Sequence, residues 1–74
     1  MRAMKYLVVI EKGPKSYGAY VPDLPGCVAV GKSRRQAQRL IHQAIELHLH
    51  AMRDAGQRIP RPTALSQYVE AKVG

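Results

Sequence analysis

Apolar and polar residues alternate along the first part of the chain and predict three short β-strands. The expected strands cover residues 4–11, 17–21 and 27–30, which are rich in residues that favour pleated structure. Gly and Pro interrupt the pattern in the connections 12–16 (KGPKS) and 22–26 (PDLPG). Within the first expected strand Tyr6, Val8 and Ile10 lie on one face, and within the second Tyr17, Ala19 and Val21 lie on one face. Short connections between three strands indicate an antiparallel meander.

The hydrophobic period then changes to that of an α-helix. Ser33 and Gln36 form the S-x-x-Q pattern of a capping box, in which both side chains bind exposed backbone amides at a helix start. Apolar and small residues follow at helical spacing: Ala37, Leu40, Ile41, Ala44, His48, Ala51, Met52 and Ala55. Gly56 supplies a stop signal. The pattern predicts one long amphipathic helix from Arg34 to about Ala55.

The C-terminal part combines a proline-containing connection with another alternating segment. Residues 57–63 (QRIPRPT) form the connection, and residues 66–73 (SQYVEAKV) alternate between small apolar and charged side chains near their end. We interpret the second segment as a short fourth strand, with a short terminal helix as the alternative. The order β-β-β-α-β predicts a single α+β domain over residues 1–74, with the helix covering one face of the sheet.

The size of the chain limits its core. It has 74 residues, no Trp and no Phe, and its aromatic residues are four Tyr. A domain this short buries a smaller share of its surface than a larger one. We therefore expect additional burial through self-association, as a dimer or higher homo-oligomer.

Several features bear on where the protein works. The single cysteine, Cys27, cannot form an intramolecular disulfide. The N-terminal apolar run is short, ends in Glu11 and Lys12, and lacks the cleavage site of a signal peptide. No stretch approaches the roughly 20 apolar residues of a membrane span. We expect a cytoplasmic protein without a membrane partner.

The stretch GCVAVGKS, residues 26–33, matches the nucleotide-binding pattern G-x-x-x-x-G-K-[ST]. A working P-loop is a glycine-rich turn whose backbone amides surround the phosphates. Here the intervening residues, CVAV, favour a half-buried strand, and PDLP replaces the strand that should precede the loop. We interpret the match as coincidental.

A different resemblance involves the same residues. The run YGAYVPDLPGC, a following Gly31, Ser33 as a helix cap and the helical AIEL resemble the HicB-like antitoxin family, as do VVIEK and GQRIPRP. The resemblance covers most of residues 5–62. It implies a partial ribonuclease-H-like α+β fold that usually self-associates. Its members are antitoxins that neutralise a small HicA-like, mRNA-cleaving toxin by covering the toxin's catalytic surface.

The sequence departs from this family in two ways. Many members carry a further C-terminal DNA-binding domain, whereas this chain stops at Gly74, so we expect a short, stand-alone member. Members that bind a basic toxin are commonly acidic, whereas this chain has a net charge of +7 and a pI of about 10.1. Such a charge favours encounters with nucleic acid, acidic proteins or anionic surfaces and leaves the partner's identity open.

The loop between the second and third expected strands is the first candidate for partner binding. It consists of Pro22, Asp23, Leu24, Pro25 and Gly26. It is either a tip that faces the partner or a rigid connector that fixes the angle between two strands. A rigid loop loses little entropy on binding, which makes it a reasonable contact.

A cluster of cations at the helix start is the second candidate. Lys32, Arg34, Arg35 and Arg39 are either contacts for phosphates or an acidic partner, or a solvated charged face. If they bind phosphates, the chain is a basic nucleic-acid-binding module, which is the alternative to an antitoxin.

The remaining reactive side chains form no catalytic or metal-binding pattern. A nuclease needs carboxylates clustered around Mg²⁺, and here they are scattered over different elements: Glu11, Asp23, Glu46, Asp54 and Glu70. His42, His48 and His50 lack the i, i+4 spacing of a helical metal site. Cys27 has no recognisable activating base, so we expect a small buried residue. We predict no enzyme activity, no cofactor and no metal.

Overall fold

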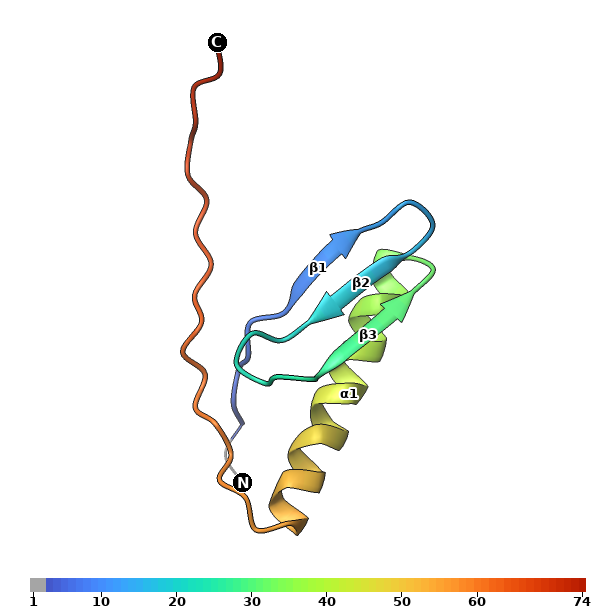
Figure 1. The fold of residues 1–74 in the computed structure, drawn as a ribbon, viewed down its shortest axis with the longest axis vertical. Coiled ribbons are helices and arrows are strands. Elements are labelled where there is room, and N and C mark those ends of the chain that lie inside the picture. The colour runs from blue at the N-terminus through green and yellow to red at the C-terminus, as the bar shows by residue number, and fades with distance from the viewer. Residues whose placement is uncertain (1–2) are drawn as a thin grey trace.

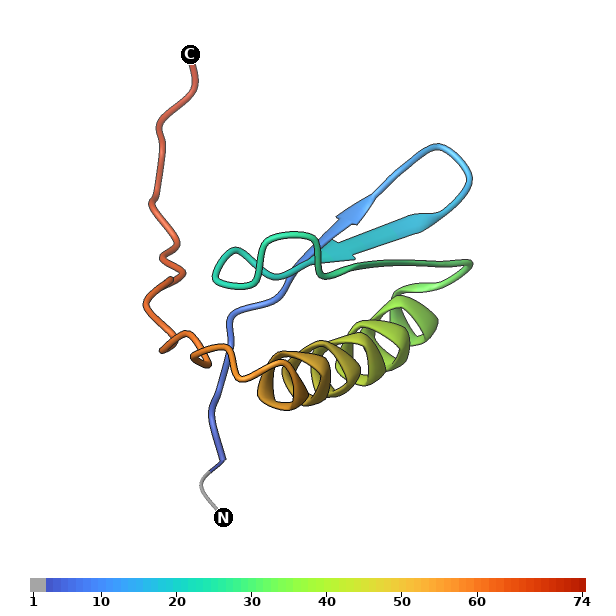
Figure 2. The same ribbon diagram turned by 60° about the horizontal axis from the view of Figure 1, so that its bottom comes forward.

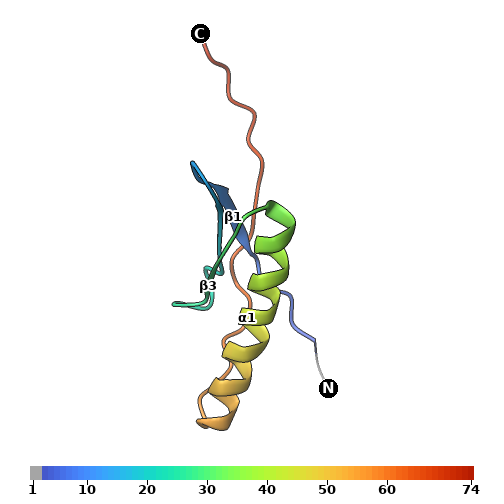
Figure 3. The same cartoon turned by 90° about the vertical axis from the view of Figure 1, so that its right-hand side faces the viewer.

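The structure is a computed structural model that describes residues 3–74. It contains three strands, β1 (Val9–Lys12), β2 (Tyr17–Tyr20) and β3 (Val28–Gly31), and one helix, α1 (Arg34–Asp54). The strands form an antiparallel sheet in the order β1-β2-β3, and α1 covers one face of it (Figures 1 and 3). The predicted α+β meander with one long helix is therefore confirmed.

The core lies between the sheet and the helix (Figure 2). Its buried residues are Ala19, Val21, Leu24, Cys27, Ala37 and Ile41. Tyr6, Val8, Ile10 and Tyr17 pack partly buried against them, so the two alternating sets of the first two strands lie together on the inner face of the sheet. Cys27 is 3% exposed, as expected of a small core residue.

The predicted signals set both ends of the helix. Ser33 Oγ accepts a hydrogen bond from the Gln36 amide at 3.1 Å, and Gln36 Oε1 accepts one from the Lys32 amide at 2.6 Å. At the other end, Gly56 has a φ of 72°, the left-handed conformation that commonly follows a helix. The capping box and the stop at Gly56 are thus confirmed.

The buried stripe of the helix differs in its second half from the prediction. The helical residues that meet the core are Ala37, Ile41, Ala44, Ile45 and Leu49. Ala51 and Ala55, which were expected on the stripe, are exposed. The reason is length: a 21-residue helix spans about 31 Å, whereas a four-residue strand spans about 13 Å. The last turns of α1 therefore extend past the sheet.

The first strand is shorter than predicted. Its first residue, Val9, pairs with Tyr20, the last residue of β2. The next residue, Val21, turns into the loop and accepts a hydrogen bond there from the Leu24 amide. Residues 4–8 therefore have no neighbouring strand on β2, although their sequence favours one.

The fourth strand predicted over residues 66–73 is not confirmed. In the structure, residues 57–74 contain neither strand nor helix, and the segment runs away from the body of the molecule (Figure 1). Its apolar side chains contact little of the chain, since Val69 is 77% exposed and Val73 is 97% exposed. A strand requires a hydrogen-bonded neighbour, and none lies beside this segment in the single described chain.

The tight contact between β3 and α1 gives a first prediction. A Cβ added to Gly31 would lie 2.6 Å from the Ala37 amide nitrogen and 3.0 Å from its Cα. We expect Gly31→Ala to lower the free energy of unfolding by about 1–3 kcal/mol because the helix backbone must shift. Urea denaturation measures this. Gly18→Ala is the control, because a Cβ at that strand position meets nothing within 4 Å; equal losses in both variants would contradict the prediction.

Candidate functional site

The predicted contact loop, Pro22–Gly26, is held rigidly by its own backbone. The Val21 amide donates to the Cys27 carbonyl at 3.3 Å, and the Cys27 amide donates to the Leu24 carbonyl at 3.1 Å. Gly26 has a φ of 85°, which residues with a side chain rarely adopt. The Leu24 side chain, 1% exposed, fixes the loop to the core from inside.

The five predicted contact residues therefore face three directions. Pro22, Pro25 and Gly26 are exposed, whereas Leu24 points into the core. Asp23 is half-buried and directs its carboxylate toward the C-terminal part of the chain. A role of the loop in binding a partner stays a prediction, and its exposed prolines are the side chains that are free to make the contact.

Asp23 anchors the base of the C-terminal segment. Its Oδ2 accepts hydrogen bonds from the amides of Thr63 and Ala64 at 2.8 and 2.9 Å, and its Oδ1 accepts one from Thr63 Oγ1 at 2.7 Å. Close by, the Tyr6 hydroxyl donates to the Pro60 carbonyl. Burial raises the pKa of Tyr6, and the Asp23 carboxylate adds to this shift, so the hydroxyl keeps the proton that it donates.

This anchor is expected to depend on pH. The pKa of Asp23 is lowered, first by the Ala64 amide and then by the hydroxyl and amide of Thr63. Because the pKa is lowered in the folded state, the ionised carboxylate stabilises the anchor at pH values above the ordinary carboxyl pKa. This stabilisation is lost as the pH falls through the folded-state pKa. The amide NMR signals of Thr63 and Ala64 should therefore move in acid, below about pH 4. If the Thr63 and Ala64 amide signals shift with pH in the same way in Asp23→Ala, the Asp23 carboxylate is not the cause of the shift.

The outer face of the sheet carries apolar side chains next to the loop. Tyr20 pairs directly with Val28, and Val30 lies two residues further along the same face. These residues, the outer-face patch, are 40%, 63% and 65% exposed, respectively. Because the Pro22–Gly26 loop connects Tyr20 to Val28, the patch and the loop form one continuous surface. Large contiguous apolar patches on a protein surface are typical of protein-binding sites, which makes this surface a candidate contact for a partner.

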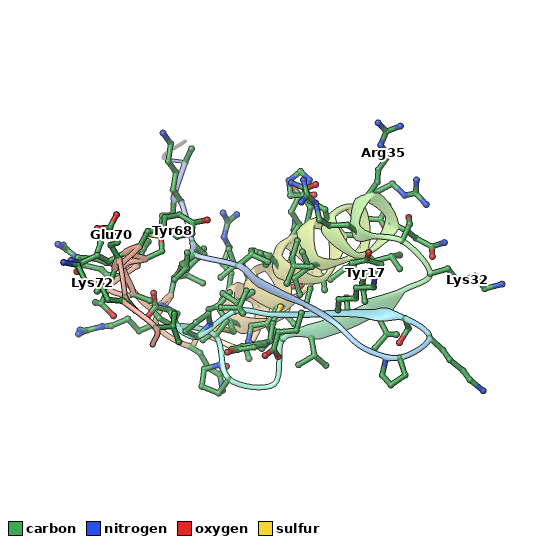
Figure 4. The ribbon with its side chains drawn as sticks, turned by 90° about the horizontal axis from the view of Figure 1, so that it is seen from above. Tyr17, Lys32, Arg35, Tyr68, Glu70 and Lys72 are labelled. Atoms are coloured by element: carbon green, nitrogen blue, oxygen red, sulfur yellow. The ribbon has the colours of Figure 1, made fainter. Side chains whose placement is uncertain are left out.

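The basic cluster, Lys32, Arg34, Arg35 and Arg39, is exposed at the start of the helix. Figure 4 shows Lys32 and Arg35 pointing outward at the end of the molecule opposite the C-terminal segment. None of the four forms an ion pair with another residue in the range 3–74. The first helical turn contains no acidic residue, so the cluster adds its charge to the positive end of the helix dipole.

The residues considered for metal binding or nucleophilic chemistry lie apart. His42 and His50 are exposed, and His48 is half-buried. Across residues 3–74 no three His, Cys, Asp or Glu side chains are placed to share a metal ion. Burial raises the pKa of the Cys27 thiol, which disfavours the reactive thiolate. Among the described residues there is also no helix of the length and apolarity that crossing a membrane requires.

The nucleotide-binding pattern is part of the sheet. Residues 28–31 form β3 and pair in register with β2 from Tyr17 to Tyr20. Their backbone amides and carbonyls therefore belong to a strand, not to a turn that could surround a phosphate. The interpretation of this match as coincidental agrees with the observed strand.

Comparisons with known proteins identify relatives in phages, bacteria and archaea. An uncharacterized 14.9 kDa protein from the rep-hol intergenic region of Haemophilus phage HP1 is 32% identical over 66 residues, 89% of this chain and 50% of the relative. This chain thus spans about half the length of that protein. A UPF0150 protein of Thermoplasma acidophilum is 37% identical over 62 residues, 82% of this chain and 90% of the relative. One from Helicobacter pylori is 56% identical over 41 residues, 55% and 57% of the two chains.

No solved structure matches the chain. The family model that matches describes a HicB-like antitoxin of a bacterial toxin-antitoxin system, and it covers residues 6–73. This range includes the loop, the outer-face patch, the helix and most of the C-terminal segment. The chain therefore belongs to the HicB-like antitoxin family.

Proposed function

We propose that this protein is a non-catalytic antitoxin that neutralises a small HicA-like, mRNA-cleaving toxin by direct protein–protein contact. The family match supports the antitoxin role. The observation that carries the proposed site is the outer-face patch, which continues into the rigid Pro22–Gly26 loop. In this proposal the surface covers the toxin's catalytic side, and no bond is made or broken.

The physical properties of this surface suit a protein partner. Val28 and Val30 are already exposed, so a partner that covers them removes apolar area from water without unfolding the antitoxin. The backbone hydrogen bonds of the loop hold Pro22 and Pro25 in place before binding, which lowers the entropy lost on association. Tyr20 adds an aromatic side chain of a type that often dominates binding energy.

The charge of the chain also constrains the contact. A net charge of +7 repels a basic toxin at long range. Apolar contact on the outer face keeps the toxin away from Arg34, Arg35 and Arg39 on the helix, although Lys32 directly follows β3. Across the sheet, Gly18 of β2 pairs with Glu11 on one side and with Val30 on the other. Glu11 is therefore the charged residue nearest to Val30 in this row of paired residues. We therefore propose that the toxin meets the outer-face patch and not the basic cluster.

The proposal extends to the complete assembly. We propose a homo-oligomer in the cytoplasm, with a fourth strand that completes a ribonuclease-H-like sheet. The thin core supports self-association, because only six hydrophobic residues are buried in it among residues 3–74. The exposed apolar side chains of residues 65–73 support the fourth strand, since no other part of residues 3–74 covers them.

A binding experiment tests the antitoxin role. The tagged full chain is mixed with a HicA-like toxin encoded in the same genome, and the complex is weighed by native mass spectrometry. The proposal predicts a stoichiometric complex that persists after nuclease treatment. Two proteins that remain separate at micromolar concentration would contradict it.

The exposed basic cluster favours a second candidate function, binding of nucleic acid through phosphates. In that case Arg34→Ala combined with Arg35→Ala should weaken binding for all sequences alike. The slope of log K against log salt should fall by about two, because each lost phosphate contact on duplex DNA removes roughly 0.9. Fluorescence anisotropy with a labelled duplex measures the slope. An unchanged slope would exclude these two residues from nucleic-acid binding.

A further inference from the structure

Gly18, in the middle of the sheet, is a glycine that the fold of its own chain does not require. Its φ is not in the left-handed region, unlike that of Gly26. A Cβ at Gly18 would meet nothing within 4 Å, whereas one at Gly31 would lie 2.6 Å from the helix backbone. Glycine weakens a strand, because it packs no side chain and loses much backbone freedom on folding. In strands it often marks a place that another molecule approaches closely.

The open space at Gly18 lies on the outer face of the sheet. Ala19 and Ala29 pack against the core, so their neighbours along each strand point to the other face. Gly18 pairs with Glu11 on β1 and with Val30 on β3, which places the three residues in one row on the outer face. The helix lies on the other side of the sheet (Figure 3). The space is therefore open to a partner that covers the outer-face patch.

Three side chains surround this space, and their chemistry differs from side to side. Glu11 and Val30 stand on the two neighbouring strands, and Tyr20 follows two residues along β2. Together with Gly18 they are here called the Gly18 site. No atom of the three side chains comes within 4 Å of the position that a Cβ of Gly18 would take. The site is thus bare at its centre, with a carboxylate on one side, an aliphatic group on the other and an aromatic ring at one end.

The carboxylate of the Gly18 site determines what can bind there. Glu11 is exposed and forms no ion pair with another residue in the range 3–74. A carboxylate that is covered by a partner must be paired, because burying an unpaired charge is costly. Lysine and arginine supply the charge, and their aliphatic stems pack on apolar groups while the charged end reaches further. The ring of Tyr20 also attracts a cation.

We propose that the Gly18 site receives one lysine or arginine side chain of the toxin. Its stem lies over Gly18 between Tyr20 and Val30, and its charged end pairs with Glu11. The inference rests on the proposed function and names a chemical contact within the proposed toxin surface. A protein that cleaves mRNA needs basic side chains to hold phosphates, so the covered surface of such a toxin supplies the cation.

This contact also explains how a chain with a net charge of +7 can bind a basic surface. Glu11 provides a local attraction at the centre of the contact, where water is excluded and the pairing is strong. One cation neutralises one carboxylate, so the site leaves no partner for a further acid placed at Val28 or Val30. Glu11 is therefore the residue that selects a basic group on the toxin.

Isothermal titration calorimetry of the full chain with the toxin tests the site. Glu11→Gln keeps the shape and removes the charge, so it should weaken binding at least 10-fold, about 1.4 kcal/mol. Gly18→Val should weaken binding to a similar extent because its side chain fills the space. The valine variant keeps its fold, which urea denaturation checks, since a Cβ there meets nothing and valine favours strands.

Glu46→Gln is the matched control. It makes the same chemical change at an exposed carboxylate on α1, and it should leave the affinity within about twofold. If the native chain binds the toxin and either site variant, Glu11→Gln or Gly18→Val, binds as tightly, this inference is overturned and the proposed function stands. If the native chain does not bind, the proposed function fails and this inference fails with it.

A double-mutant cycle identifies the partner of Glu11. Each lysine and arginine of the toxin is replaced by methionine in turn, and each toxin variant is titrated with the native chain and with Glu11→Gln. We expect one toxin substitution to weaken binding of the native chain about 10-fold and to leave binding of Glu11→Gln within about twofold. A purely structural effect of Glu11→Gln would weaken binding of all toxin variants equally. A toxin in which no basic residue is coupled to Glu11 would overturn the proposal.

Discussion

Replacing Val28 and Val30 by aspartate is expected to weaken toxin binding at least 100-fold, about 2.7 kcal/mol, while the fold is kept. Both side chains lie on the outer-face patch and are more than 60% exposed, so the folded chain accepts charges there. In the complex, two carboxylates would be buried without partners, which costs more than the lost apolar contact alone. Isothermal titration calorimetry with the toxin measures the change.

Leu47→Asp is the matched control for this variant. Leu47 is 73% exposed on α1, away from the outer face of the sheet, so the substitution introduces one carboxylate, half the charge of the double variant, at similar exposure. It should leave the affinity within about threefold, as is usual for surface changes outside an interface. If both variants bind as tightly as the native protein, the toxin does not contact the outer face.

Replacing Leu24 by alanine is expected to lower the free energy of unfolding by about 3 kcal/mol, because it leaves a cavity in a small core. Leu24 is 1% exposed and is one of the two largest fully buried side chains. Small domains are stable by only about 5–15 kcal/mol, so this single change removes a large part of the stability. Urea denaturation measures the loss.

Pro25→Ala provides the comparison for Leu24. Pro25 is the next residue in the same loop, but its side chain is exposed. Its replacement should change the free energy of unfolding by less than about 1 kcal/mol. A Leu24→Ala variant as stable as Pro25→Ala would show that the loop is not fixed through the core. If Leu24→Ala is destabilised as predicted and also binds the toxin more weakly, the weaker binding reflects the loss of loop rigidity as well as any change in the contact with the toxin.

The strands and the helix could be predicted from the sequence because their signals are local. Alternation separated the two faces of each strand, and the structure shows that the faces of Ile10 and Ala19 are the inner ones. The pair of Ser33 and Gln36 marked the helix start. The period of 3.6 identified α1, but not which part of its stripe is buried. That depends on where the short sheet ends, a tertiary property that leaves Ala51 exposed.

The candidate site was only partly predictable. The loop was identified by its composition, yet the sequence does not show that Leu24 turns inward. It also does not show that Asp23 binds Thr63, because the two residues are 40 positions apart. The one available signal for the outer-face patch was that Val28 and Val30 are apolar at positions where an outer face is normally polar.

Residues 65–73 show the opposite case. Their alternation is a genuine strand signal, but a strand forms only when a partner supplies the second row of hydrogen bonds. Among residues 3–74 no strand pairs with residues 65–73. The sequence pattern alone therefore could not show whether the fourth strand forms.

The most direct test of the antitoxin claim is a titration of toxin activity. A fixed amount of the HicA-like toxin cleaves a labelled mRNA while the full chain is added in increasing amounts. We expect cleavage to fall in proportion to the added chain and to stop near a one-to-one ratio. In the presence of the Val28→Asp, Val30→Asp double variant, we expect cleavage to continue. Cleavage that continues unchanged in the presence of excess chain would contradict the account.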